Sequence, residues 1–114
     1  MTIRWISPDE LFAVEQTEMR YIRVQWIHQH PDEPVEMYSE LDEAGWETRK
    51  VEVFRDGTIG FASSSEAGGL TELGEGPLPS LEEIASDPEF RPMQISKDEF
   101  EGVWAKRRSP IPSA

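Results

Sequence analysis

The sequence predicts one α+β domain, with an antiparallel sheet of four or five strands and two or three short helices packed mainly on one face. Three observations support this fold class. A chain of 114 residues suits a single domain. Segments of alternating polarity, separated by short turns, indicate antiparallel strands. Ser-x-x-Glu motifs at residues 7–10, 80–83 and 96–99 indicate the first turns of helices, because this pattern forms a capping box.

The two ends of the chain are predicted to lie outside the sheet. A Ser-Pro-Asp-Glu sequence at residues 7–10 predicts a helix from Pro8 to about Glu15. This helix belongs to an N-terminal extension of residues 1–18. Residues 109–114 contain two prolines and are predicted to be a disordered tail, so the domain spans residues 1–108.

The first two strands are predicted at Arg20–His28 and Val35–Asp42, with a turn between them that contains two prolines. Glu43-Ala44-Gly45 is typical of a three-residue hairpin loop with glycine in the left-handed position. That loop length pairs Met37 with Val51. A loop of two or four residues would place Met37 opposite a lysine instead, so the three-residue loop is favoured.

The stretch from Glu47 to Ala62 predicts two more strands, joined at Asp56-Gly57, which is the strongest hairpin signal in the chain. A two-residue turn there pairs Phe54 with Ile59 and places Val53 opposite Gly60. Gly60 and Ala62 are small and lie opposite Val53 and Val51 in this register. A closely packed helix is therefore expected on that face of the fourth strand.

The predicted sheet has an apolar face and a mixed face. The apolar face carries Ile22, Val24, Trp26, Val35, Met37, Leu41, Val51 and Val53. The mixed face carries Tyr21, Tyr38, Trp46, Phe54, Ile59 and Phe61 among charged residues. Either further elements cover part of the mixed face, which we favour, or it is an exposed aromatic surface that marks a binding site.

The C-terminal half of the chain adds smaller elements. Ser63–Gly76 is a long polar loop, and loops of this length are usually functional or mobile. A second capping box predicts a helix from Leu81 to about Ser86, and a short strand is expected within Phe90–Ile95. The last helix, Lys97 to about Arg107, carries an apolar stripe for the sheet.

The charge of the chain is strongly acidic, with 11 Lys and Arg against 23 Asp and Glu and a net charge of −12. Nucleic-acid binding needs cationic side chains, so direct binding to nucleic acid is disfavoured. Anionic membranes are disfavoured for the same reason, and no signal peptide or apolar membrane span is visible. The balance favours a basic protein partner.

The acids are concentrated in two stretches that contain no Lys or Arg. Seven lie between Gln29 and Glu47, and eight lie between Asp56 and Phe90. Acidic residues on turns, together with nearby Tyr, Trp and Arg, are predicted to contact the partner. These candidate partner-binding residues are Arg23, Asp32, Glu33, Glu36, Tyr38, Glu40, Asp42, Glu43, Trp46, Glu66, Glu72 and Glu75.

No motif for catalysis or for a cofactor is present. The chain has no cysteine, which excludes disulfides and thiolate metal sites and fits a cytoplasmic location. His28 and His30 lie near Asp32 and Glu33, but their spacing is not that of a metal site, and no metal or cofactor is predicted. No catalytic residue is assigned, and an enzyme is less favoured than a binding protein.

Several segments resemble a family of small bacterial proteins described as a domain of unknown function. They are Arg20–His28, Pro31–Glu40, Arg49–Gly57, Leu81–Ile84, Asp87–Phe90 and Ile95–Trp104. The resemblance covers most of the chain from about Arg20 to Trp104 and implies no known activity. In size and charge only, the chain is also similar to immunity proteins that neutralise bacterial toxins.

Two functions are therefore expected. The first is a protein-binding module, an acidic immunity-type inhibitor that neutralises a basic bacterial toxin such as a nuclease. The alternative is a small-molecule-binding domain or small enzyme that uses the aromatic face of the sheet. A concave pocket lined by Tyr21, Tyr38, Trp46 and Phe61, with the Ser63–Gly76 loop as a lid, would favour the alternative.

Overall fold

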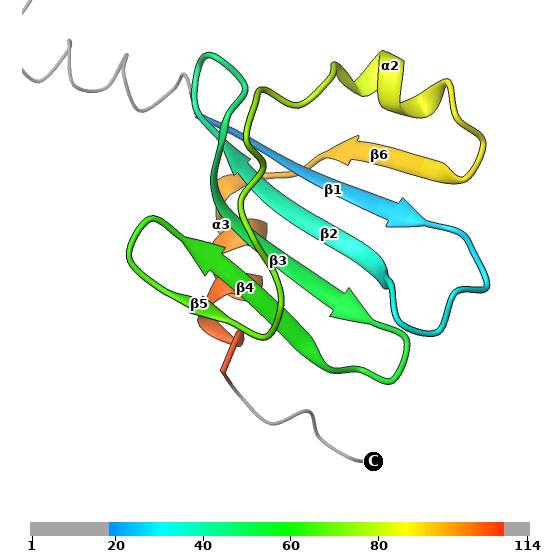
Figure 1. Cartoon of the computed structure of the whole chain (residues 1–114). Helices are drawn as coiled ribbons and strands as arrows, with labels where there is room; N and C mark the ends of the chain where they lie inside the picture. Colours follow the sequence, from blue (N-terminus) through cyan, green and yellow to red (C-terminus); the bar gives the residue numbers. More distant parts are fainter. Residues whose placement is uncertain (1–18, 109–114) are drawn as a thin grey trace, which may run out of the picture.

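The computed structural model describes residues 19–108, which form a six-stranded antiparallel sheet with two short helices against it (Figure 1). The strand order is β5-β4-β3-β2-β1-β6. The strands are β1 (Arg20–Trp26), β2 (Pro34–Leu41), β3 (Glu47–Phe54), β4 (Ile59–Ser63), β5 (Ala67–Gly68) and β6 (Phe90–Gln94), and the helices are α2 (Leu81–Ala85) and α3 (Lys97–Ala105). The α+β class is confirmed. The expected helix at Pro8–Glu15 and the expected tail at 109–114 lie outside the described residues.

The predicted hairpin loop between β2 and β3 is confirmed. The Asp42 N–H donates to the Trp46 carbonyl at 3.0 Å, and the Gly45 N–H donates to the Asp42 carbonyl at 2.9 Å. Gly45 has a φ of +88°, which glycine adopts without the strain of a side chain. The Asp42 carboxylate accepts hydrogen bonds from the backbone of Ala44 and Trp46, so this acid stabilises the turn itself.

The predicted two-residue turn at Asp56-Gly57 is wrong by one residue. The Phe54 N–H donates to the Thr58 carbonyl at 2.9 Å, which encloses a three-residue loop. Val53, not Phe54, therefore pairs with Ile59. The Asp56 carboxylate accepts from the Thr58 N–H at 2.9 Å, and this side-chain bond favours the longer loop.

A bulge at Thr48 offsets the middle of the β2–β3 pairing. Leu41 pairs with Glu47, as the predicted register requires, but Glu40 pairs with Arg49, so Thr48 is left without an opposite residue. The Thr48 hydroxyl lies 2.8 Å from Glu40 Oε1 and 3.2 Å from the Glu40 carbonyl oxygen. The extra residue is therefore held by a specific side-chain contact.

This bulge reverses the faces that β3 was expected to present. Val51 pairs with Tyr38 and Met37 pairs with Glu52, so the predicted Met37–Val51 pair is wrong. A second irregularity, before Glu36, restores the original register at the far end of the strands. Because a one-residue shift turns every side chain to the opposite face, the β3 valines move to the face that carries Tyr38.

Both faces of the sheet are covered, so the helices do not pack mainly on one face. One core cluster contains Tyr21, Ile95 and Phe100, with Trp104 of α3 packed against it. The other contains Ile22, Val24 and Leu41, with Leu81 and Ile84 of α2 packed against it. In Figure 1, α3 lies behind the sheet, and the segment between β5 and α2 crosses in front. The expected partial cover of the mixed face is confirmed, and α3 provides it.

A loop, not the expected helix, packs closely on Gly60 of β4. Thr71 lies in the segment that follows β5, and its side chain donates to Glu52 Oε1 at 2.8 Å. A Cβ atom added at Gly60 would lie 2.1 Å from Thr71 Oγ1. The absence of a side chain at Gly60 therefore allows this loop to lie on the sheet.

Replacing Gly60 with alanine is expected to lower the free energy of unfolding by about 1–3 kcal/mol, because Thr71 must move and lose its bond to Glu52. Urea unfolding followed by tryptophan fluorescence measures the change. Gly76→Ala is the matched control, since no atom lies within 4 Å of its added Cβ; this change should stay within about 0.5 kcal/mol. An equal effect of both substitutions would contradict the packing argument.

Strand β6 forms one edge of the sheet and contains Pro92 opposite Val24. The Ile95 N–H donates to the Tyr21 carbonyl, and the Ile27 N–H donates to the Glu89 carbonyl. Since bonded and non-bonded pairs alternate along an antiparallel ladder, the Pro92 nitrogen faces away from β1. Within residues 19–108, no helix is long and apolar enough to cross a membrane.

Candidate binding groove

A groove of about 380 Å³ opens between α2 and the sheet. Val24, Met37, Ser39 and Lys50 line it from strands β1, β2 and β3, while Leu78, Ile84 and Phe90 line the opposite side. Glu83 and Asp87 lie at its acidic margin, and both are exposed. A mostly apolar cavity with a few polar groups is the usual form of a ligand-binding or anchor site.

The bulge at Thr48 explains why this groove is not filled by core residues. It pairs Ser39 with Lys50 and Met37 with Glu52 on the groove side of the sheet. In the predicted register, Val51 and Val53 would have occupied this side. The bulge thus puts Lys50 and Glu52, not the two valines, on the groove side of β3. This part of the sheet has fewer apolar side chains to pack against other elements, and the groove remains open there.

Part of the groove, here called its polar end, is lined by Ser39, Glu47 and Lys50. The Glu47 side chain is only 2% exposed. Its carboxylate accepts from Ser39 Oγ at 2.9 Å and from the Gly74 N–H at 2.7 Å. Lys50 Nζ lies 3.5 Å from Glu47 and 3.8 Å from Glu52. The two hydrogen bonds and the nearby ammonium leave Glu47 little capacity for a further partner, whereas the Lys50 ammonium keeps hydrogen-bonding capacity.

The surface around the groove is acidic. Between Asp56 and Phe90 the chain contains no Lys or Arg. The segment from the end of β5 to the start of β6 exposes six acids, which are Glu72, Glu75, Glu82, Glu83, Asp87 and Glu89. Since this segment also forms the outer wall of the groove, a cationic group that approaches the opening is attracted to it.

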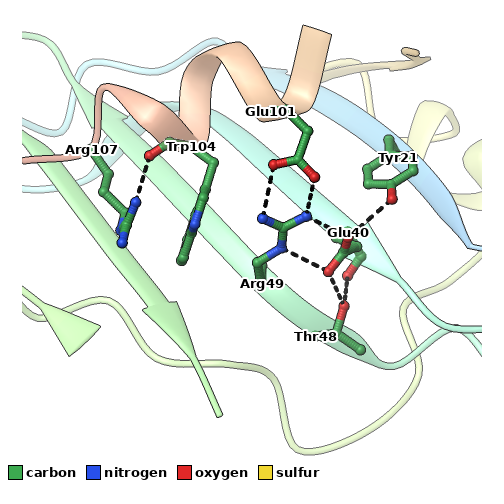
Figure 2. Close-up of polar contacts among 7 residues, drawn as sticks. All are labelled: Tyr21, Glu40, Thr48, Arg49, Glu101, Trp104 and Arg107. Carbon is green, nitrogen blue, oxygen red and sulfur yellow. Dashed lines mark hydrogen bonds and ion pairs between the residues drawn. The ribbon is translucent and has the colours of Figure 1, made fainter. Parts of the chain in front are cut away.

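A second polar cluster, on the opposite face, joins α3 to the sheet (Figure 2). Arg49 donates to both oxygens of Glu40, at 2.8 and 2.6 Å, and to both oxygens of Glu101, at 3.1 and 2.7 Å. The Tyr21 hydroxyl donates to Glu40 at 3.0 Å. The Arg49 guanidinium also lies over the Phe100 ring, 4.9 Å from its centre. Four of the five N–H donors of this guanidinium are bonded to carboxylates of the chain, which indicates a structural role.

The environment of this cluster shifts the pKa values of its members. Burial alone would raise the pKa of Glu40, but hydrogen bonds from Arg49 and Thr48 hold it below its usual value. The hydrogen bond from Arg49 also lowers the pKa of Glu101. Burial, followed by the hydrogen bond to Glu40, raises the pKa of Tyr21 to about 12.

We expect these shifts to make stability fall at both ends of the pH scale. The carboxyl groups of Glu40 and Glu101 have lower pKa values in the folded state than in the unfolded state. Their contribution to the free energy of unfolding is therefore present above about pH 4.3 and is lost as the pH falls below it. Tyr21 has a raised pKa, so its contribution is lost as pH rises from about 10 toward 12. Urea unfolding across the pH range tests both limbs. In a Glu40→Gln variant, the free energy of unfolding should fall less steeply as the pH is lowered. An unchanged acid dependence would contradict the contribution of the Glu40 carboxylate.

None of the twelve predicted partner-binding residues lines the groove, and three of the acids are paired within the chain. Glu36 bonds Arg23 at 3.1 Å and accepts from the Tyr38 hydroxyl at 2.7 Å. Glu66 pairs with Arg107 at 2.5 Å and with Arg108. Glu40 pairs with Arg49, as described above. These carboxylates are neutralised by arginines of this chain.

The remaining predicted residues are spread over separate parts of the surface. Asp32 and Glu33 lie in the β1–β2 loop, and Glu43 and Trp46 lie at the β2–β3 hairpin, where Trp46 is exposed. Glu72 and Glu75 lie on the segment that borders the groove. The structure does not gather the twelve residues into one surface, and their contact with a partner stays a prediction.

The aromatic residues of the mixed face do not line a pocket together. Tyr21 and Phe61 are buried, and the Phe61 ring meets Trp104 of α3 edge-on at 5.9 Å. His28 is also buried, with Nε2 bonded to the Pro34 carbonyl and Nδ1 bonded to the His30 N–H. Within residues 19–108, no group of three His, Asp or Glu side chains is arranged to hold a metal ion.

The sequence predictions did not identify the residues that form the groove. The sequence pattern predicts Val24 and Met37 on the apolar face and Lys50 on the mixed face, beside Tyr38. In the structure, Lys50 pairs with Ser39 and lies on the groove side of the sheet. The signal that was available is the acid-only stretch that includes Glu82, Glu83 and Asp87, next to apolar Leu81 and Ile84. It marks an acidic helix with an apolar side, but it does not indicate what that side faces.

Comparison with known proteins identifies a family for this chain. A family model described as "Domain of unknown function (DUF6881)" matches residues 20–109. No curated protein and no solved structure gives a significant match. The matched region includes every strand and helix that contributes to the groove.

Proposed function

The chain belongs to the family described as a domain of unknown function (DUF6881), and we propose that this domain is a protein-binding module for a basic protein partner. The observation that carries the proposal is the groove between the sheet and α2, with its apolar interior and acid-only border. An apolar cavity supplies desolvated contact, and the surrounding carboxylates favour a cationic surface.

In its narrower form, the proposal is that the partner is a basic bacterial toxin domain, such as a nuclease, and that this chain is its immunity-type inhibitor. The active site of a nuclease attracts nucleic-acid phosphates and is therefore cationic. A net charge of −12 accelerates encounter with such a surface and repels nucleic acid itself. The predicted cytoplasmic location places the inhibitor where an incoming nuclease would act.

The proposal is tested by capturing partners with the full chain from producing cells, followed by measurement of affinity with the purified partner. We expect the dissociation constant to increase about tenfold or more from low to physiological ionic strength, because exposed charges are screened. A partner that is acidic, or an affinity indifferent to salt, would overturn the proposal. Recovery of a toxin encoded next to this chain's gene would support the narrower form.

Charge variants locate the binding surface. Glu75 and Glu82 are exposed, and neither side chain forms an ion pair within the described residues. The Glu75→Gln/Glu82→Gln double variant should weaken binding by up to about tenfold. Asp98→Asn/Glu99→Gln changes the net charge equally on exposed residues of α3, across the sheet from the groove. Equal weakening by both variants would place the partner elsewhere.

A further inference from the structure

We infer that the groove is an anchor site, which receives one large apolar side chain from a segment whose adjacent residues are lysine or arginine. This inference rests on the proposed protein-binding function and specifies the chemistry of the partner segment. It draws on the lining of the groove, its polar end and its charge, which are independent features of the described residues.

The lining of the groove fits an apolar side chain. Val24 is buried at the floor, and Met37, Ile84 and Phe90 are half-buried around it. The volume of about 380 Å³ corresponds to the share of about a dozen waters in the liquid. Water held against such walls is released when an apolar group replaces it, so burial of this apolar lining is favourable.

The polar end of the groove fits the backbone beside that side chain. Glu47 already accepts hydrogen bonds from Ser39 and Gly74, so it has little capacity left for a ligand. The Lys50 ammonium carries three protons and has two carboxylates within 3.8 Å. Its remaining donor capacity suits the carbonyl oxygen of an extended segment that lies across the opening.

The charge of the groove selects against anions. Three carboxylates, from Glu47, Glu83 and Asp87, and one ammonium, from Lys50, line it. An apolar ligand with an acidic head, such as a fatty acid, would therefore be repelled. A second copy of this chain is also disfavoured by its own charge of −12. An apolar residue between two cationic residues would pack against the apolar lining of the groove and place positive charge beside the acidic residues around its opening.

Three capped tripeptides test the inference on the full chain, with the methyl signals of Val24, Met37 and Ile84 followed by NMR. Lys-Phe-Lys should shift these signals with a dissociation constant in the millimolar range or below, as expected for so small a ligand. Lys-Ser-Lys lacks the apolar anchor and Glu-Phe-Glu reverses the charge, so both should bind at least about tenfold more weakly. Equal shifts from all three peptides, or no shift from Lys-Phe-Lys, would overturn the inference.

A pair of variants adds a structural control. Ile84→Phe narrows the groove from the α2 side and should weaken Lys-Phe-Lys binding about fivefold or more. Val103 is half-buried on α3, on the opposite face of the sheet from the groove. Val103→Phe therefore makes a similar change in size away from the groove and should leave peptide binding unchanged. If the methyl signals of Met37 and Ile84 shift with protein concentration in the absence of peptide, a second copy of the chain occupies the groove. That result would overturn the inference.

The outcomes separate this inference from the proposed function. If the peptide binds but the chain captures no basic protein, the groove chemistry stands and the protein-binding function is lost. If a basic partner is captured and Ile84→Phe does not change its affinity, the function stands and the anchor site is refuted.

Discussion

Replacing Phe100 with alanine is expected to lower the free energy of unfolding by about 3–5 kcal/mol. Phe100 is fully buried and lies at the centre of the contact between α3 and the sheet. Its ring centre is 5.4 Å from that of Tyr21 and 6.3 Å from that of Trp104. A nine-residue helix is marginal in isolation, so α3 depends on this packing. Urea unfolding followed by circular dichroism measures the loss.

Two further variants keep the Phe100 prediction testable if the alanine variant does not fold. Phe100→Leu retains most of the buried volume and should destabilise by a smaller amount, about 1–2 kcal/mol. Gly102→Ala lies on the same helix, where an added Cβ meets nothing within 4 Å. It should raise stability by about 0.5–1 kcal/mol, because alanine favours helix more than glycine does. A Phe100→Leu variant as stable as the parent would show that α3 is not held through this ring.

Replacing Arg49 with methionine is expected to destabilise the domain by about 3 kcal/mol. The substitution keeps an unbranched apolar stem but removes the guanidinium that holds Glu40 and Glu101. The Glu40 side chain is only 10% exposed, so its carboxylate would be left buried with hydrogen bonds only from Tyr21 and Thr48. Loss of one partner of a buried ion pair costs more than the pair itself contributes.

A double-mutant cycle distinguishes the unpaired charge from lost packing. Glu40→Gln removes the charge that Arg49→Met leaves behind, so the double variant should lose less stability than the sum of the two single variants. Glu101→Gln is the mild control, because the Glu101 side chain is 41% exposed and its pairing contributes about 0–1 kcal/mol. Simple additivity of the Arg49 and Glu40 changes would contradict the ion-pair explanation.

Local signals predicted most of the elements but not the faces of the central strands. Helix α2 begins at Leu81 after Ser80, which forms both halves of its capping box, and Ser96 caps α3, because these contacts lie within four residues. The predicted register of β2 and β3 agrees with the structure at the Gly45 turn but differs from it by one residue after Thr48. A bulge depends on a contact between Thr48 and Glu40, on different strands, and alternation of polarity cannot indicate it.

The candidate groove was beyond sequence reasoning for the same reason. It combines residues from β1, β2 and β3 with residues from the segment around α2, and only the fold brings these together. The acidic composition was visible, but its distribution was not: Glu36, Glu40 and Glu66 are held by arginines of this chain, whereas Glu75 and Glu82 remain at the surface. Net charge alone does not distinguish these two groups.

The proline in β6 has a consequence for the behaviour of the protein at high concentration. An edge strand that offered an unbroken row of amide hydrogens could recruit the edge of another molecule and grow into a fibril. Pro92 removes the middle donor of that row, and β5, at the other edge, is only two residues long. Within the described residues, the sheet therefore ends on both sides without a long row of free amides for extension, which favours a domain that stays dispersed at high concentration.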